Sequence, residues 1–271
     1  CAYVGTNATL SGFTLTNGAT ITTNERPASQ IFSDASGGGV WAQSAAAVIS
    51  NCVIVGNAAS SDHWNNYSGG GAHMGTLFNC TLAGNFADMG GGAHLAILSN
   101  CTVAGNSAVL GDGGGTRACT LYGCVISNNN AATFNGGGMY QGAAYHSVLA
   151  GNSSREGGGA YDAVLSNCMV VGNVASNRGG GTRSGTLTHC QIVSNRIGGV
   201  TDRWGAGAYG GVFSNCVFAY NVNPSGPGGG VNIGTLYNCL VYANRATDGG
   251  GTIESTLINC TVIGNSGSAN G

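Results

Sequence analysis

The sequence is poor in charge and in proline. Its 271 residues contain no lysine, 8 arginines and 10 acidic residues, so the formal net charge is −2 and only 7% of residues are charged. This balance provides neither a basic surface for nucleic acid nor an acidic tail. With 3 prolines and no Gly-x-y period the chain is not collagen-like, although 51 residues are glycine. A hydrophobic fraction of 42% excludes a disordered chain, and no apolar run approaches the roughly 18 residues of a membrane span.

The abundant feature is a repeat. Glycine triplets begin at Gly37, Gly69, Gly90, Gly113, Gly136, Gly157, Gly179, Gly228 and Gly249, and a Gly-Ala-Gly variant begins at Gly205. A cysteine usually follows nine residues after the triplet, and these cysteines form the Cys column: Cys52, Cys80, Cys101, Cys124, Cys168, Cys190, Cys216, Cys239 and Cys260. Five residues after the cysteine position comes an asparagine, and these form the Asn ladder: Asn57, Asn85, Asn106, Asn129, Asn152, Asn173, Asn195, Asn221, Asn244 and Asn265. Ser147 takes the cysteine position of one repeat, and Phe13 takes it in a degenerate first copy.

This repeat predicts the fold. A period of 21 to 23 residues without a helical pattern indicates one solenoid coil per repeat. Each column cysteine and the apolar residue two positions later, such as Cys124 and Ile126, share the inward face of a strand. We therefore predict an all-β protein, a single-stranded right-handed parallel β-helix (β-solenoid) of about eleven coils and about 50 Å in length. Residues 1–271 would form one such domain, either a segment of a longer chain or a stackable fibre subunit.

The two columns have predicted structural roles. An asparagine in a turn satisfies backbone groups of its own and neighbouring coils, so we interpret the Asn ladder as structural rather than chemical. Stacked column cysteines would have Cα atoms about 4.8 Å apart, which a disulfide tolerates, but parallel side chains favour buried thiols over a run of disulfides. A single file of cysteines offers no tetrahedral ligand set, so no metal site is predicted. Cys1 and Cys119 lie outside the column.

A third column stands two residues after each glycine triplet and is rich in aromatic and cationic side chains. It consists of Trp41, His73, His94, Arg117, Tyr140, Tyr161, Arg183 and Tyr209, followed by Asn232 and Ile253. Because its neighbours, such as Ala72 and Val231, are small or aliphatic and should point inward, this column is predicted to point outward. Stacked rings and guanidinium groups form platforms for sugar rings or another protein, and they also stabilise a strand by stacking alone. The two longest loops add Trp64 and Trp204 as candidate contact residues.

Catalytic groups are not evident. The 10 acidic residues are scattered over nearly every coil, whereas glycoside hydrolysis needs two carboxyl groups about 5 to 9.5 Å apart. Glu156 and Arg178 occupy one turn column on successive coils, which predicts a surface ion pair. His73 and His94 lack the carboxylate partners that metal-binding histidines usually have. The sequence therefore predicts no catalytic residue, no cofactor and no metal, and we expect that the protein is not an enzyme.

The positions flanking the inward core residue are uncharged in every repeat, for example Val53, Val125, Val148 and Ala219. A flat face of such side chains exceeds what soluble monomers usually expose. Neither end of the chain shows the polar capping unit with which solenoids normally close. We therefore expect the face and ends to contact further copies, as a homo-oligomer or filament, or flanking coils of the same longer chain.

Short motifs carry a family resemblance. The segments Gly70-Gly71-Ala72-His73, Gly91-Gly92-Ala93-His94 and Gly158-Gly159-Ala160-Tyr161 approximate Gly-Gly-Ala-Ile, and Phe218-Ala219-Tyr220-Asn221 matches Phe-x-x-Asn. In these motifs the chain resembles the parallel β-helix repeats of bacterial surface proteins, especially the polymorphic outer-membrane, autotransporter-passenger type. The resemblance covers nearly the whole chain. It implies secretion and an extracellular or bacterial cell-surface location.

Two functional hypotheses follow. The first is a non-catalytic extracellular structural or adhesive solenoid that self-associates into a filament. The alternative is a carbohydrate-active module, a polysaccharide lyase or hydrolase or a glycan-binding domain, because the same fold also carries such activities; it would use the outward aromatic column. Besides copies of the chain, the candidate partners are a glycan and a host or cell-surface protein. Nucleic acid and a membrane span are not expected.

Overall fold

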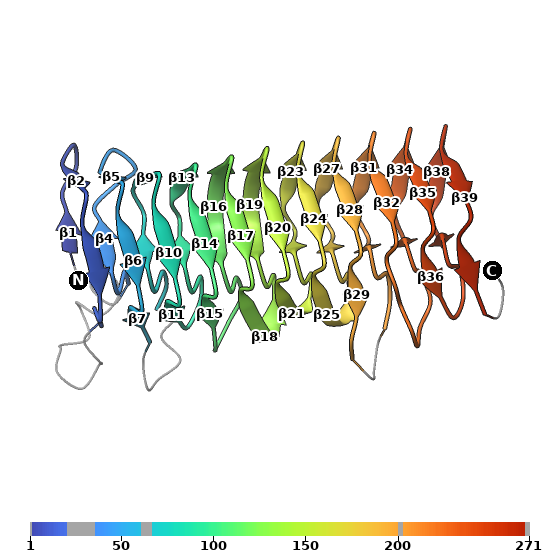
Figure 1. Ribbon diagram of the computed structural model, residues 1–271, viewed down its shortest axis with the longest axis horizontal. Helices are drawn as coiled ribbons and strands as arrows, with labels where there is room; N and C mark the ends of the chain where they lie inside the picture. Colours follow the sequence, from blue (N-terminus) through green and yellow to red (C-terminus); the bar gives the residue numbers. More distant parts are fainter. Residues whose placement is uncertain (1, 21–35, 61–66, 200–202, 269–271) are drawn as a thin grey trace.

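The computed structural model describes residues 2–20, 36–60, 67–199 and 203–268. These residues form strands, bridges, turns and bends, and none of them is helical. Short parallel strands stack along one axis, so the molecule is a rod with its two termini at opposite ends (Figure 1). The predicted all-β solenoid is confirmed. The right-handed sense of the coil stays a prediction.

The strand that follows each Cys column position builds an 11-stranded sheet, one strand per coil. In spatial order its strands are β3 (Thr14–Thr16), β6 (Val53–Val55), β10 (Thr81–Ala83), β14 (Thr102–Ala104), β17 (Val125–Ser127), β20 (Val148–Ala150), β24 (Met169–Val171), β28 (Gln191–Val193), β32 (Val217–Ala219), β35 (Leu240–Tyr242) and β39 (Thr261–Ile263). Every neighbouring pair is parallel and in register. The strand count agrees with the predicted number of coils.

A 20-stranded sheet contains two ladders that share the long strands β16 (Thr116–Tyr122) and β19 (Met139–Tyr145). The first ladder consists of β1 (Ala2–Val4), β4 (Val40–Ala42), β8 (Ala72–His73), β12 (Ala93–His94), β16, β19, β22 (Ala160–Tyr161), β26 (Thr182–Arg183), β30 (Ala208–Tyr209), β33 (Val231–Asn232) and β37 (Thr252–Ile253). The second consists of β2 (Thr9–Ser11), β5 (Val48–Ser50), β9 (Thr76–Phe78), β13 (Ile97–Ser99), β16, β19, β23 (Val164–Ser166), β27 (Thr186–Thr188), β31 (Val212–Ser214), β34 (Thr235–Tyr237) and β38 (Thr256–Ile258).

The remaining side of the rod carries a 7-stranded sheet and, nearer the C-terminal end, a 2-stranded one. The first consists of β7 (Ala58–Ala59), β11 (Phe86–Ala87), β15 (Ser107–Ala108), β18 (Asn130–Asn135), β21 (Ser153–Glu156), β25 (Val174–Arg178) and β29 (Arg196–Ile197), and the second of β36 (Arg245–Ala246) and β40 (Ser266–Gly267). Between the two sheets Val222 makes only isolated bridges, to Arg196 and to Arg245. This interruption shapes the groove described below.

The core is a set of columns that run the length of the rod. In β17 the side chain of Ile126 is 0% exposed whereas that of Val125 is 42% exposed, so the predicted alternation across this strand is confirmed. The aromatic pair Phe213 and Phe218 fills one level of the core, with ring centroids 5.0 Å apart and an edge-on geometry. Ala219 was expected on the outer face and is only 1% exposed. Its ladder neighbours Val193 and Tyr242 are both larger and leave this alanine little contact with solvent.

Left-handed backbone conformations form the corners of each coil. The residue before each column cysteine has a positive φ and is usually an exposed asparagine, as in Asn100, Asn167 and Asn215. Asparagine tolerates this region better than most residues. This second asparagine column was not predicted from the sequence. Another corner separates the two ladders of the 20-stranded sheet. Just after it, Gly142 has a φ of 87°, and a Cβ there would lie 2.1 Å from the carbonyl oxygen of Cys119, so only glycine fits.

Candidate functional site

The Asn ladder lies inside the rod, and its amides bond to one another and to the backbone. Nδ2 of Asn173 donates to the carbonyl oxygen of Leu149 at 2.9 Å and to Oδ1 of Asn195 at 3.0 Å. Oδ1 of Asn173 accepts from the backbone N–H of Asn152 at 2.9 Å and from its Nδ2 at 3.0 Å. Nine of these amides are buried, and Asn265 is half-buried. Bonds of this kind repeat along the ladder, so its amides serve the backbone and not a ligand.

The Cys column is a second hydrogen-bonded ladder. Sγ of Cys101 accepts the backbone N–H of Cys80 at 3.4 Å and donates to the carbonyl oxygen of Ser99 at 3.3 Å. At the exceptional position, Oγ of Ser147 accepts the N–H of Cys124 at 3.0 Å and donates to the carbonyl oxygen of Tyr145 at 2.8 Å. The serine thus makes the same bonds as the thiol it replaces.

All cysteines of the described residues are free thiols, and all but Cys260 are buried. Cys119 lies outside the column, and burial raises its pKa to about 12, which keeps the thiol protonated. Cys1 lies outside the described residues. The buried neutral thiol of Cys119, which donates to the carbonyl oxygen of Arg117, fills space in the core and is not placed to react.

The third column lies along the first ladder of the 20-stranded sheet, and its side chains form a continuous stack from Tyr3 to Tyr209. In register order it runs Tyr3, Trp41, His73, His94, Arg117, Tyr140, Tyr161, Arg183, Tyr209, Asn232 and Ile253. The rings of Tyr3 and Trp41 stack with centroids 5.2 Å apart, and so do those of Tyr140 and Tyr161. The guanidinium of Arg117 continues the stack, with its carbon 5.9 Å from the ring centroid of Tyr140.

The outward direction predicted for this column is consistent with its buried strand neighbours, since Ala72 and Val231 are 0% exposed, but the column is much less exposed than a free outer surface. His94 is only 9% exposed, Asn232 is fully buried, and the other members from Trp41 to Ile253 are half-buried. The physical reason is the stacking itself, because each flat side chain is covered on both faces by its neighbours one coil away. Only the rims of the rings face solvent. The ring faces on which a sugar would stack are therefore already occupied.

His73, His94 and Arg117 form a hydrogen-bonded chain within this stack. The guanidinium can only donate, so NH1 of Arg117 donates to Nε2 of His94 at 3.1 Å. Nδ1 of His94 must then carry the proton, and it donates to Nδ1 of His73 at 3.3 Å. Burial lowers the pKa of His73 to about 4. Burial, followed by the charges of His73 and Arg117, lowers the pKa of His94 to about 3. Both imidazoles are neutral at neutral pH.

An ion pair joins the stack at Arg183. Oε2 of Glu156 is 2.6 Å from Nε of Arg183, and Oε1 is 3.9 Å from NH2 of Arg155. Arg183 also lies over the ring of Tyr161, at 4.8 Å, and donates to its hydroxyl. Glu156 and Arg178 share a rung as expected. The surface position predicted for Glu156 is wrong, because the carboxylate is buried where Arg183 holds it.

The two loop tryptophans have different outcomes. Trp64 lies outside the described residues. Trp204 is half-buried and belongs to the coil wall. Its backbone N–H donates to the carbonyl oxygen of Asn177, and its carbonyl oxygen accepts from the backbone N–H of Gly179, both at 3.0 Å. Trp204 also bridges Arg178 as a strand partner would. It is held in the coil rather than projected from it.

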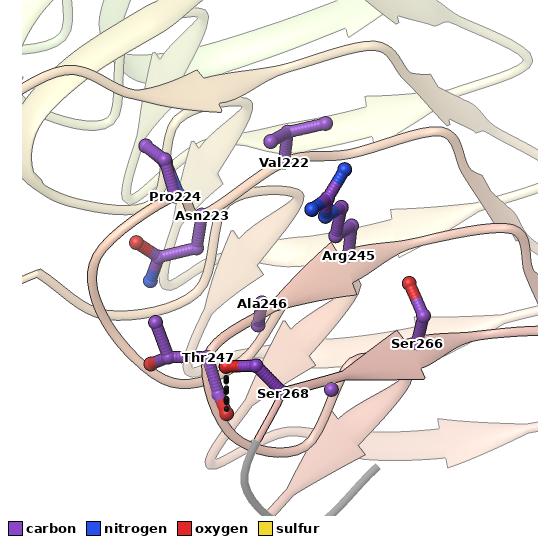
Figure 2. A pocket seen from close by; sticks show the side chains of 9 residues that line it. Val222, Asn223, Pro224, Arg245, Ala246, Thr247, Ser266 and Ser268 are labelled. Carbon is purple, nitrogen blue, oxygen red and sulfur yellow. Dashed lines mark hydrogen bonds between the residues drawn. The ribbon is translucent and has the colours of Figure 1, made fainter.

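A groove of about 440 Å³ lies where the third side of the rod is interrupted (Figure 2). Three successive coils line it, and they supply Val222, Asn223 and Pro224, then Arg245, Ala246 and Thr247, then Ser266, Gly267 and Ser268. This groove was not among the features predicted from the repeat pattern. The signal was present, because two of the chain's 3 prolines, Pro224 and Pro227, fall in this loop, and proline ends strand pairing.

The described part of the chain contains neither a cluster of metal-binding side chains nor a membrane-spanning helix. No group of three or more His, Cys, Asp or Glu residues there could hold a metal ion. Nor does that part contain a helix long and apolar enough to cross a membrane.

Comparisons with known proteins add little to this geometry. No family model matches the chain, and no curated protein matches it. Among solved structures, the chain is similar to a crystal structure of a TibC-catalysed, hyper-glycosylated fragment of TibA, residues 55–350. The sequence identity is 16%, the match covers 99% of each chain, and the TM-score is 0.23. A similarity of this size carries no argument about function.

Proposed function

We propose that the protein is a non-catalytic structural or adhesive solenoid, located outside the cell or on a bacterial cell surface, that associates side by side with further copies of itself. The contact surface is the outer face, defined as the outward residues of the 11-stranded sheet. In this proposal residues 1–271 act as one solenoid domain, and lateral association builds a filament or bundle. The observation that carries the proposal is the complete lack of charge on this face.

The outer face is in register and uncharged over its whole length. Large apolar side chains are exposed along it, among them Val53, Val125, Met169 and Leu240. No Asp, Glu, Arg, Lys or His stands at any outward position from Thr14 to Ile263 on these eleven strands. Soluble monomers rarely expose such a patch. A second copy presents the same uncharged face, so two faces can meet without burying an unpaired charge.

The size of the face fits a reversible contact. Eleven strands about 4.8 Å apart and three residues of about 3.3 Å each give roughly 500 Å² per copy. Two faces would then bury about 1,000 Å², the lower limit for a specific interface. We therefore expect association in the micromolar range rather than a permanent dimer.

The carbohydrate-active alternative is not supported at the stacked column, because neighbouring rings cover the faces a sugar would use. The same stacking supports a structural role. It ties coil to coil along one side of the rod with aromatic, cation–π and ionic contacts.

Sedimentation velocity from 1 to 100 µM, with electron microscopy, tests the proposal. We expect a concentration-dependent shift from single rods to paired or bundled rods. Replacing Val125 and Met169 on the outer face by lysine (V125K/M169K) should abolish the shift. The matched control is V164K/V212K, since Val164 and Val212 are equally exposed but lie on the second ladder of the 20-stranded sheet. A parent protein that stays monomeric at 100 µM, or equal loss in both double variants, would overturn the proposal.

A further inference from the structure

The groove owes its shape to one irregular loop. Strand pairing is interrupted between Val222 and Pro227, where Pro224 has no N–H to donate to a neighbouring coil. Asn223, which is fully buried, then fixes the loop: its Nδ2 donates to the carbonyl oxygens of Arg203 at 3.1 Å and Pro227 at 2.7 Å. The N–H of Thr247 donates to Gly226 at 3.1 Å and ties the loop to the following coil. The groove is thus a built feature of the fold.

The lining combines hydroxyls, a cation and a small apolar surface. Thr247, Ser266 and Ser268 bring hydroxyl groups, Val222 and Pro224 bring apolar carbon, and Arg245 brings a guanidinium (Figure 2). Oδ1 of the buried Asn223 has no protein donor among the described residues. The volume of about 440 Å³ lies within the range of roughly 300 to 1,000 Å³ typical of small-ligand sites.

The positive charge at the groove is not neutralised. Arg245 is exposed and forms no ion pair with any residue that the structure describes, whereas Arg183 and Arg155 are both paired with Glu156. Arg196 is exposed in the same way and lies two rungs from Arg245 on the same outward ladder, with Val222 between them. Two rungs place their Cα atoms about 10 Å apart. In a protein with so few charges, two uncompensated guanidinium groups beside one groove favour an anion.

We propose that this groove binds an acidic saccharide, meaning a carbohydrate that bears carboxylate groups. Arg245 takes one carboxylate in the two-pronged geometry that guanidinium and carboxylate share. The hydroxyls of Thr247, Ser266 and Ser268 exchange hydrogen bonds with sugar hydroxyls, and Val222 and Pro224 pack against the C–H face of the ring. Arg196 meets an acidic group further along an oligosaccharide. The site is separate from the outer face, so the proposed saccharide binding does not depend on the proposed self-association.

Titration calorimetry and NMR shift mapping with three tetrasaccharides test the proposal. The probes are a galacturonic acid tetramer, a hyaluronan tetrasaccharide and, as the neutral counterpart, a galactose tetramer. We expect at least one acidic probe to bind, the neutral one to bind at least tenfold more weakly, and affinity to fall as salt rises. Shifts should centre on Val222, Arg245 and Ser266.

Variants locate the site. R245A should weaken binding at least tenfold and R196A at least threefold, while R155A, which removes an exposed arginine far from the groove, should leave the affinity unchanged. Thr247→Val tests the hydroxyl contacts without altering side-chain size and should weaken binding several-fold. Thermal melting of each variant should match the parent, because the two groove arginines are exposed. Three results would each overturn the proposal: no binding of either acidic probe at millimolar concentration, equal binding of the neutral tetramer, or full displacement by equimolar inorganic phosphate, which would show a simple anion site.

Discussion

Nδ1 of His94 lies 3.3 Å from Nδ1 of His73, and the proton between them belongs to His94. The assignment follows from Arg117, which occupies the other ring nitrogen as a donor. His73 is therefore an acceptor at Nδ1. A proton added to His73 at that atom would face the N–H of His94, so the stack requires both rings to be neutral.

This relationship predicts acid sensitivity. The pKa values of His73 and His94 fall from 6.5 to about 4 and about 3 on folding, so below pH 6.5 the unfolded chain binds more protons than the folded chain. The contribution of the two neutral histidines to the free energy of unfolding is complete above pH 6.5. It is lost as the pH falls towards 4 and 3, at up to about 1.4 kcal/mol per pH unit for each histidine. Urea unfolding at pH 7.5, 6 and 4.5 measures the slope.

The control for this experiment is the double variant H73Q/H94Q, which cannot titrate at these positions. Its free energy of unfolding should depend less steeply on pH between 6.5 and 4.5 than that of the parent. Identical slopes would show that the histidine pair does not sense acid.

Alternation across β17 makes a second prediction. Ile126→Asp places an unpaired carboxylate in the core and should lower the free energy of unfolding by several kcal/mol, whereas Val125→Asp, on the exposed side of the same strand, should cost only tenths. Thermal melting of the two variants side by side gives the comparison. Equal losses of thermal stability in the two variants would refute the assignment of Ile126 to the inward face and Val125 to the outward face.

The Asn ladder gives a third prediction. Asn173→Ala removes the acceptor of two bonds from Asn152 and the donor to Leu149, and it leaves buried polar groups unpaired at a cost of about 1 to 3 kcal/mol. Gln191→Ala, an exposed amide on the following coil, is the matched control and should be nearly neutral. Chemical unfolding distinguishes them. If Asn173→Ala unfolds at the parent's denaturant midpoint, the ladder does not contribute to stability.

The Cys column gives a fourth prediction, since Ser147 shows that a hydroxyl makes the same two hydrogen bonds as the thiol. Cys101→Ser should therefore stay within about 1 kcal/mol of the parent. Cys101→Ala leaves the N–H of Cys80 without its acceptor and should cost about 1 to 3 kcal/mol. Urea unfolding in the presence of a reductant measures both variants. The reverse order of stability would mean that the column cysteines matter only for packing.

Much of this architecture was predictable, because a solenoid repeats one local environment in every coil. The offset between Cys124 and Ile126 placed both on the inward face, and the same offset in the other repeats indicated the number of coils. Such inferences need only the two-residue period of a strand and a constant repeat length. They do not depend on contacts between particular side chains.

Contacts that depend on side-chain reach and on irregular loops emerged only in three dimensions. The spacing of Glu156 and Arg178 indicated one rung, but the carboxylate is buried and meets Arg183, whose guanidinium lies over the ring of Tyr161. The amphipathic pattern placed His94 on the outside, yet its neighbours in the stack cover it. The groove exists because Pro224 breaks the regular strand pairing. The repeat pattern predicts only what every coil has in common, so it does not predict the structure of this irregular loop.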